Sequence, residues 1–203
     1  MRPAKRLLLC IVAPMVGWAS IPSAMAEPPP DPRQTIEEAY KNIAVAAREA
    51  TDQKALSKQL IDEMDARMDH QGFSARTLKG KWDRLSASQR ARFIKHFKRL
   101  VIHTYAKRFK PGASFEVEYR DATRWLDESK TRGEVMTTVM GEKAGADVDY
   151  LVRWDKRKKT WKIIDITVDE VSMSRNWRRQ FVRVIDDEGF EALIKRIRKK
   201  TDP

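Results

Sequence analysis

The spacing between apolar residues changes from four to two just after the middle of the chain, and this change restricts the fold more than any other feature. Aromatic and branched side chains recur at every fourth position over 93–109, which is the spacing of one helix face. Pro111 and Gly112 then end the helical pattern. From Ser114 apolar and polar residues alternate, which predicts strands at 114–120, 133–140, 146–154 and 161–168.

Capping residues and apolar spacing predict helices on both sides of these strands. Asp31 before Pro32 is a helix start, and Ser86 with Gln89 forms a capping box that starts the helix running to about Phe109. Further helices are expected at 53–69, after Ser74, at 174–187 and at 190–200, and the first should cover 32–50. Helices, a strand meander and helices again predict an α+β domain, with an antiparallel sheet of about four strands and helices packed on one face.

The N-terminus has the three parts of a signal peptide. Basic residues precede an apolar run from Leu7 to about Ala19, and Ala24-Met25-Ala26 ends the segment, so cleavage is expected before Glu27. A retained membrane anchor is the alternative, but prolines interrupt the run, which is shorter than the ~20 residues that span a bilayer. We expect a signal peptide at 1–26, a proline-rich spacer at 27–31 and one domain at 32–203, with no cysteine after Cys10.

The charge balance is strongly basic. The whole chain has a net charge of +12, and residues 27–203 keep 38 lysines and arginines against 29 acidic residues, a net charge of +9. An anionic partner is expected, whether lipid headgroups, an acidic protein or a polyanion, although net charge also serves solubility alone. The basic run 195–200 alternates with isoleucines as on an amphipathic helix, so we expect no nucleic-acid partner.

Few residues suggest catalysis or metal binding. His96 and His103 lie seven apart on one predicted helix, whereas helical metal sites use a spacing of four, and no metal site is expected. Asp165 stands out within the apolar run 161–168. A carboxylate in apolar surroundings suits a general base, and it is equally suited to a structural role in which backbone donors or an arginine hold it. The structural role is the preferred interpretation, and no enzyme is expected.

Two segments, 85–106 and 161–193, resemble the MlaC family, also called the toluene-tolerance auxiliary proteins. The second has W-K-x-x-D at 161–165, V-S at 171–172 and Phe181, although Asp169-Glu170 stands where the family commonly has Glu-Gly. The resemblance implies a soluble periplasmic phospholipid carrier with a deep apolar cavity. Its implied partners are phospholipid, an inner-membrane ABC lipid transporter with a membrane-anchored substrate-binding subunit, and an outer-membrane lipoprotein complex. We expect a monomer. We also expect no cofactor, because the bound phospholipid is the cargo.

The predicted site residues follow from the apolar patterns and this resemblance. Arg178, Asp165 and Ser172 are expected to hold the headgroup or to serve as structural polar groups. The alternatives are a carrier of another apolar lipid, such as a hopanoid, and a cavity enzyme that uses Asp165. The residues expected to contact acyl chains are Phe93, Phe97, Val101, Tyr105, Val139, Tyr150, Val152, Ile164, Ile166, Val171, Met173 and Phe181.

Overall fold

The computed structural model describes residues 29–105, 109–142 and 144–201, so the predicted signal peptide and the start of the spacer lie outside the described residues. Five helices begin within one residue of the predicted positions, while α4 ends before Phe109 and α3 begins before Ser74. The helices are α1 (Pro32–Glu49), α2 (Gln53–Arg67), α3 (His70–Thr77), α4 (Ala87–Tyr105), α5 (Met173–Glu188) and α6 (Phe190–Thr201).

The early start of α3 comes from its N-cap. The Asp69 carboxylate accepts a hydrogen bond from the Gly72 backbone N–H at 2.8 Å, and the Asp69 N–H donates to the Ile163 carbonyl at 2.9 Å. Glycine is a weak helix former, so the sequence pattern hides this first turn. The cap and the bond to Ile163 fix the start of α3 against the sheet.

The strands form one antiparallel sheet in the order β1-β3-β4-β5-β6, with β2 paired to β3. The four long strands match the predicted ranges to within one residue. The prediction of about four strands missed β2 and β6, because two residues are too few to show an alternating pattern. The strands are β1 (Phe115–Tyr119), β2 (Arg124–Trp125), β3 (Arg132–Gly141), β4 (Gly145–Asp155), β5 (Thr160–Val168) and β6 (Val171–Ser172).

A β-bulge in β5 changes which of its side chains face the interior. Ile163 pairs with Val152 and Ile166 pairs with Tyr150, so Ile164 is the extra residue of the bulge. Simple alternation would place Ile164 and Ile166 on one face of the sheet, with Ile163 on the other. The bulge instead places Ile163 and Ile166 on the same face, and Asp165 on the opposite one.

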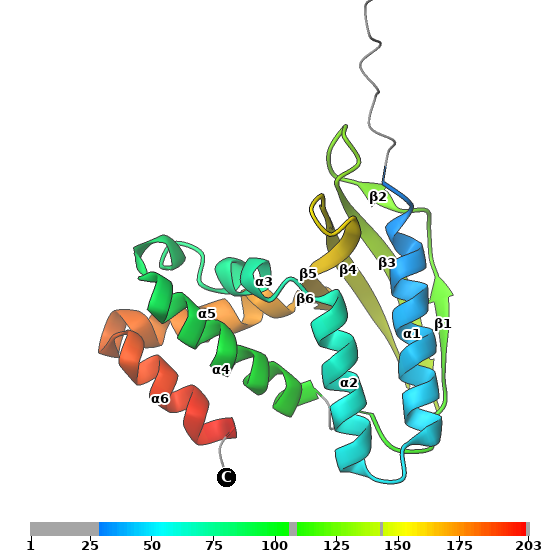
Figure 1. Cartoon of the computed structure of the whole chain (residues 1–203), viewed down its shortest axis with the longest axis horizontal. Helices are drawn as coiled ribbons and strands as arrows, with labels where there is room; N and C mark the ends of the chain where they lie inside the picture. The colour runs from blue at the N-terminus through cyan, green and yellow to red at the C-terminus, as the bar shows by residue number, and fades with distance from the viewer. Residues whose placement is uncertain (1–28, 106–108, 143, 202–203) are drawn as a thin grey trace, which may run out of the picture.

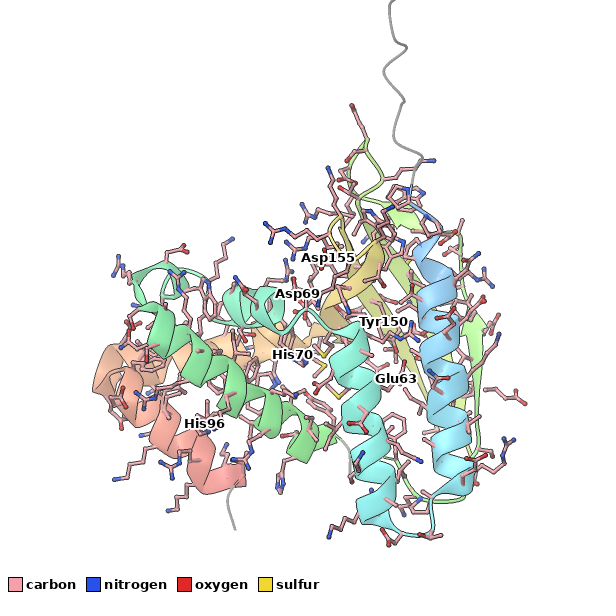
Figure 2. All side chains as sticks on the ribbon, viewed as in Figure 1. Glu63, Asp69, His70, His96, Tyr150 and Asp155 are labelled. Atoms are coloured by element: carbon pink, nitrogen blue, oxygen red, sulfur yellow. The ribbon has the colours of Figure 1, made fainter. Side chains whose placement is uncertain are left out.

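Helix α1 covers the face of the sheet that carries Val152 and Tyr150 (Figure 1). Tyr150 is labelled in Figure 2. Its hydroxyl is 2.5 Å from that of Tyr40, and the two rings meet edge to face. The Trp161 indole N–H donates to the Pro30 carbonyl at 2.6 Å, which fixes the start of α1 near β5. Helix α1 therefore packs on one face of the sheet as expected, while α3 and α5 contact β5 from its other face.

Helices α3 to α6 extend the molecule away from the sheet (Figure 1). We call residues 70–105 and 173–201 the helical lobe, which contains α3 to α6. We call residues 29–69, 109–142 and 144–172 the sheet lobe. The predicted capping box starts α4: the Gln89 N–H donates to the Ser86 hydroxyl at 3.2 Å, and the Ser86 N–H donates to the Gln89 side chain at 2.9 Å. One apolar cluster runs through both lobes, so they share a core.

Candidate functional site

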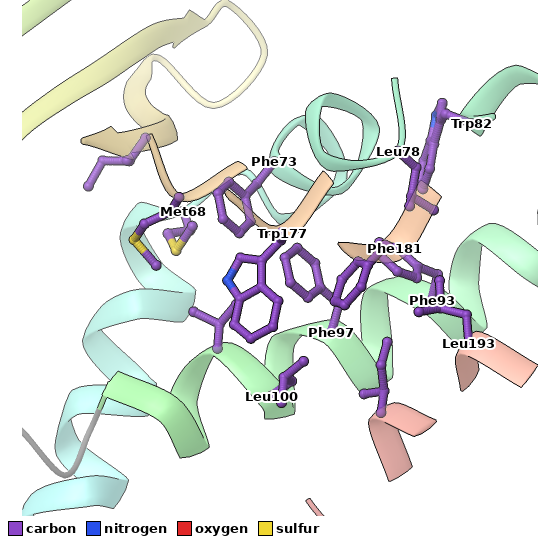
Figure 3. Packing of buried hydrophobic residues seen from close by; sticks show 14 of the residues in the cluster. Met68, Phe73, Leu78, Trp82, Phe93, Phe97, Leu100, Trp177, Phe181 and Leu193 are labelled. Atoms are coloured by element: carbon purple, nitrogen blue, oxygen red, sulfur yellow. The ribbon is translucent and has the colours of Figure 1, made fainter. Parts of the chain in front are cut away.

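Phe97 lies at the centre of the apolar interior of the helical lobe. Its ring is 5.3 Å from that of Phe73 and 5.1 Å from that of Phe93, both in stacked arrangements, and Phe181 and Trp177 meet it edge to face (Figure 3). These five rings come from α3, α4 and α5. Such ring pairs contribute about 0.5–1.5 kcal/mol each beyond the area that they bury. The α4 stripe therefore faces aromatic side chains of two neighbouring helices.

The structure brings most of the predicted acyl-contacting residues into one cluster. Phe93, Phe97, Val101, Val152, Met173 and Phe181 are buried members of it, and Tyr105, Tyr150 and Ile166 pack against its edge. Ile164 is buried outside this cluster, and Val139 is half-buried on β3. Val171 is 51% exposed, so it does not face the interior as the sequence predicts. The reason is the turn between β5 and β6, which directs Val171 to the solvent side.

That turn contains the residues at which the sequence departs from the family pattern. Asp169 and Glu170 have φ angles of 46° and 67°, in the left-handed region that glycine adopts without strain. The Asp169 carboxylate accepts a hydrogen bond from the Asp147 N–H at 3.0 Å, which ties the turn to β4. The turn thus forms without the glycine that the family commonly has there.

The interior between α2, α3 and α4 is closed in this structure. Met64 of α2 and Met68, the C-cap of that helix, meet the aromatic face of α4 there, and the enclosed cavity among these helices has a volume of about 10 Å³. A single water molecule needs about that much space. The residues that line it are Met64, Met68, His70, Phe73, Ser74, Ile94, Phe97, Lys98 and Val101.

Three ionisable side chains lie at the rim of this cavity. His70 Nε2 is 2.9 Å from Asp65 Oδ1, and the Lys98 ammonium forms an ion pair with the other oxygen of the same carboxylate. Burial lowers the pKa of His70 below its usual value, and the hydrogen bond to Asp65 opposes that shift. Lys98 lowers the pKa of His70 further, whereas Asp69 raises it. Asp65 therefore connects α2 to both α3 and α4.

Asp165 is buried on the opposite face of β5, where α3 and α5 pack. One oxygen accepts hydrogen bonds from the backbone N–H groups of Ile166 at 2.9 Å and Ser174 at 3.1 Å. The other accepts from the hydroxyls of Ser172 at 2.8 Å and Ser174 at 2.6 Å, and Arg76 lies 3.4 Å away. These donors fix the turn between β5 and α5, and they leave the carboxylate facing polar groups rather than the apolar cluster.

The other two predicted polar residues also make contacts within the protein. Ser172 is the N-cap of α5, and its hydroxyl accepts from the Arg175 N–H at 3.2 Å. The Arg178 guanidinium donates to the Arg76 carbonyl near the C-terminus of α3, with Nε at 3.1 Å. A cation at that end of a helix is favoured by the helix dipole. Ser172 and Arg178 thus hold α5 to β5 and α3.

Sequence reasoning missed several interior residues, of which Phe73, Met64 and Met68 are the clearest. Phe73 lies in the first turn of α3, which Gly72 hides from the sequence pattern. Met64 and Met68 lie in the predicted helix at 53–69, but the sequence did not show that they face α4. A four-residue spacing also links Trp177 to Phe181 on α5, and that signal was available.

The described residues contain neither a metal-binding cluster nor a helix suited to cross a membrane. In residues 29–105, 109–142 and 144–201, no three or more His, Cys, Asp or Glu side chains are grouped so that they would hold a metal ion. None of the helices described here combines the length and the apolar character needed to cross a membrane.

Comparison with known proteins connects this geometry to a family. No curated protein matches the sequence. The fold is similar to that of a phospholipid-binding protein from Ralstonia solanacearum, solved in complex with a phospholipid: the TM-score is 0.75 at 21% identity, covering 85% of this chain and 97% of that one. The family model described as MlaC protein matches residues 33–199, which is most of the chain. The chain therefore belongs to the MlaC family.

Proposed function

We propose that the protein carries phospholipid, with the acyl chains held between α2 and α4 in the shared core of the two lobes. The observation that carries this proposal is the continuous apolar cluster that joins Met68 of the sheet lobe to Phe97 and Val101 of the helical lobe. A diacyl lipid with ~30 methylenes exposes ~24 kcal/mol of apolar transfer free energy in water, at about 0.8 kcal/mol per methylene. A carrier must therefore enclose both chains, and a wall of aromatic and methionine side chains suits that purpose.

Binding requires the interior to open. The closed cavity holds about 10 Å³, whereas pockets for ligands much smaller than a phospholipid measure roughly 300–1,000 Å³. Acyl chains would enter between α2 and α4 and take over the contacts that the side chains of the two helices make with each other. Methionine adapts its shape easily, so Met64 and Met68 suit a surface that can pack either against α4 or against acyl chains.

The transport role extends this binding function. We propose that the mature chain works in the periplasm after cleavage near Ala26, and moves lipid between an inner-membrane ABC transporter, with its membrane-anchored substrate-binding subunit, and an outer-membrane lipoprotein complex. Family membership and the predicted signal peptide support this role. Acyl chains pass from one apolar environment to another of similar kind, so the direction of transport has to come from the partner proteins.

The alternatives differ in what they need from the interior. A hopanoid carrier would use the same apolar walls without a phosphate contact. A cavity enzyme would need Asp165 to reach substrate, and four donors from Ile166, Ser172 and Ser174 occupy its oxygens on the face away from Val152. The geometry of Asp165 therefore favours a binding protein.

Native mass spectrometry of the mature chain tests the carrier function. Freshly purified protein should retain phospholipid, and the Met64→Glu variant should remain folded by circular dichroism while losing most of that lipid, because a carboxylate at the cavity wall opposes acyl chains. Val171→Glu is the matched control: it places the same charge on an exposed apolar residue and should leave the lipid bound. Wild-type protein that never binds lipid, or equal loss in both variants, would refute the proposal.

A further inference from the structure

The rim of the closed cavity carries two hydrogen-bond donors that converge on one carboxylate. Lys98 of α4 and His70 of α3 both contact Asp65 of α2, and their side chains are 30% and 21% exposed. The same two residues line the cavity beside Phe97 and Val101. An anion at this point would therefore touch the solvent on one side and the apolar interior on the other, which is the situation of a phosphate attached to buried acyl chains.

We propose that Lys98 and His70 form the binding site for the phosphate of a bound lipid, and that the Asp65 carboxylate competes with the phosphate for them. This inference rests on the proposed carrier function. Opening the contact between α2 and α4 separates Lys98 from Asp65, because they lie on the two helices that part. The freed ammonium can then be hydrated or bind another anion, and a phosphate oxygen accepts the same hydrogen bonds that Asp65 accepted.

Substitutions of Lys98 and of Asp65 should have opposite effects on phospholipid binding. Lys98→Met removes a charge-assisted hydrogen bond to the phosphate and should weaken binding of phosphatidylglycerol about tenfold. Asp65→Asn removes a competing carboxylate and should strengthen it severalfold. Lys95→Met is the matched control, since Lys95 is an exposed lysine one turn earlier on α4 and is absent from the cavity lining. A purely structural ion pair would instead give losses of the same sign in the Lys98 and Asp65 variants.

Competition binding with two lipids of identical acyl chains provides the test. Diacylglycerol lacks the phosphate, so these variants should change its affinity far less than that of phosphatidylglycerol, and inorganic phosphate alone should not bind measurably. The inference is overturned if Lys98→Met weakens both lipids equally, if Lys95→Met weakens phosphatidylglycerol as much, or if phosphate alone binds tightly. If the wild-type protein binds neither lipid, the carrier function itself fails.

A separate observation is that the two lobes carry opposite net charge. The helical lobe contains 18 lysines and arginines and 5 acidic residues, a net charge of +13. The described residues of the sheet lobe contain 17 basic and 22 acidic side chains, a net charge of −5. The excess positive charge of the described residues thus lies entirely on the helical lobe, so an anionic surface will orient the molecule with this lobe toward it.

The basic side chains are concentrated on the outer face of α6 and α4. Leu193, Ile194 and Ile197 turn the apolar side of α6 into the core, which leaves its lysines and arginines outside. An open groove of about 610 Å³ lies between α6 and Arg92 of α4. Its single acidic side chain, Glu191, is bound by Arg92 with both nitrogen to oxygen distances at 2.7 Å. We call the basic residues that line this groove, Arg92, Lys195, Arg198 and Lys199, the α6 face.

We infer that the α6 face docks on the anionic headgroups of a membrane surface. Protein interfaces have apolar, charge-depleted centres. The large hydrophobic side chains that are exposed in the described chain all belong to the sheet lobe, namely Val45, Leu126, Met140 and Val171. The α6 face thus lacks an anchor for a protein partner, while its long basic side chains match a layer of phosphates.

Vesicle flotation tests this inference with a control for total charge. The triple variant Lys195→Gln, Arg198→Gln and Lys199→Gln should bind vesicles of equal parts phosphatidylglycerol and phosphatidylcholine about 100-fold more weakly. The control replaces Lys156, Arg157 and Lys158 of the β4–β5 hairpin by glutamine, and it should bind like wild type. Equal losses in both variants, or equal wild-type binding to pure phosphatidylcholine vesicles, would overturn the inference.

Discussion

Replacing Asp165 should reveal how much stability its hydrogen bonds provide. In Asp165→Ala the Ile166 and Ser174 N–H groups lose their acceptor at a buried site, and each loss costs about 1–3 kcal/mol. The two serine hydroxyls can turn toward each other, since they are 3.3 Å apart, and Arg76 is exposed enough to be solvated. We therefore expect a loss of about 2–6 kcal/mol, the sum of the two unsatisfied N–H groups.

Asp165→Asn is the sharper variant because it keeps the shape of the side chain. Its remaining oxygen still accepts from both backbone N–H groups, and its amide donates to hydroxyls that can rotate to accept. Only the charge interaction with Arg76 is lost, so the free energy of unfolding should fall by about 1–2 kcal/mol. Urea unfolding followed by circular dichroism measures both variants. Asp121→Asn, which removes an exposed carboxylate, is the control and should unfold like wild type.

Two results would refute this reasoning. Asp165→Ala within about 0.5 kcal/mol of wild type would show that the hydrogen bonds do not stabilise the fold. A folded Asp165→Asn protein that binds phospholipid normally but has lost a measurable turnover would show that the carboxylate is catalytic.

Three further predictions concern local features. Ser86→Ala removes the cap of α4 and should lower the free energy of unfolding by about 1 kcal/mol, which urea unfolding measures; no change would contradict a role for the capping box. Glu170→Gly relieves a left-handed backbone and should raise the melting temperature, corresponding to a gain of about 0.5–1 kcal/mol in the free energy of unfolding. An unchanged melting temperature would show that the φ of 67° carries no strain. Burial lowers the pKa of His70, so as the pH falls the unfolded chain protonates this histidine before the folded protein does. The free energy of unfolding should therefore fall as the pH drops through about 6.5. His70→Gln should reduce that fall, and an equal pH dependence in both proteins would contradict this prediction.

Local patterns were sufficient to predict the elements and the fold class. The helical stripe at 93–105, the capping box at Ser86 and the four alternating strands depend on interactions between residues close in sequence, and the structure confirms them. The errors arose where a local pattern was absent or misleading. A glycine hides the first turn of α3, and strands β2 and β6 are too short to alternate.

Side-chain placement in β5 needed the tertiary structure. The run 161–168 is nearly all apolar, so it does not indicate where alternation breaks. Pairing with β4 inserts the bulge at Ile164, which aligns Ile163 with Ile166 and leaves Asp165 on the opposite face, buried against α3 and α5. The turn that follows exposes Val171. A shift of one residue reverses the face of a strand side chain, and only the partner strand decides that shift.

The basic charge, most of the helix and strand ranges and the apolar residues available for a core follow from the sequence alone. The tertiary structure decided which of these meet: that Phe97 lies among rings from three helices, that Lys98 and His70 share Asp65, and that the positive charge collects on one lobe. The two differ in the distance along the sequence over which the interactions act. Helix and strand formation depend on neighbours a few residues apart, whereas Asp65 and Lys98, 33 positions apart, become partners only when α2 packs beside α4.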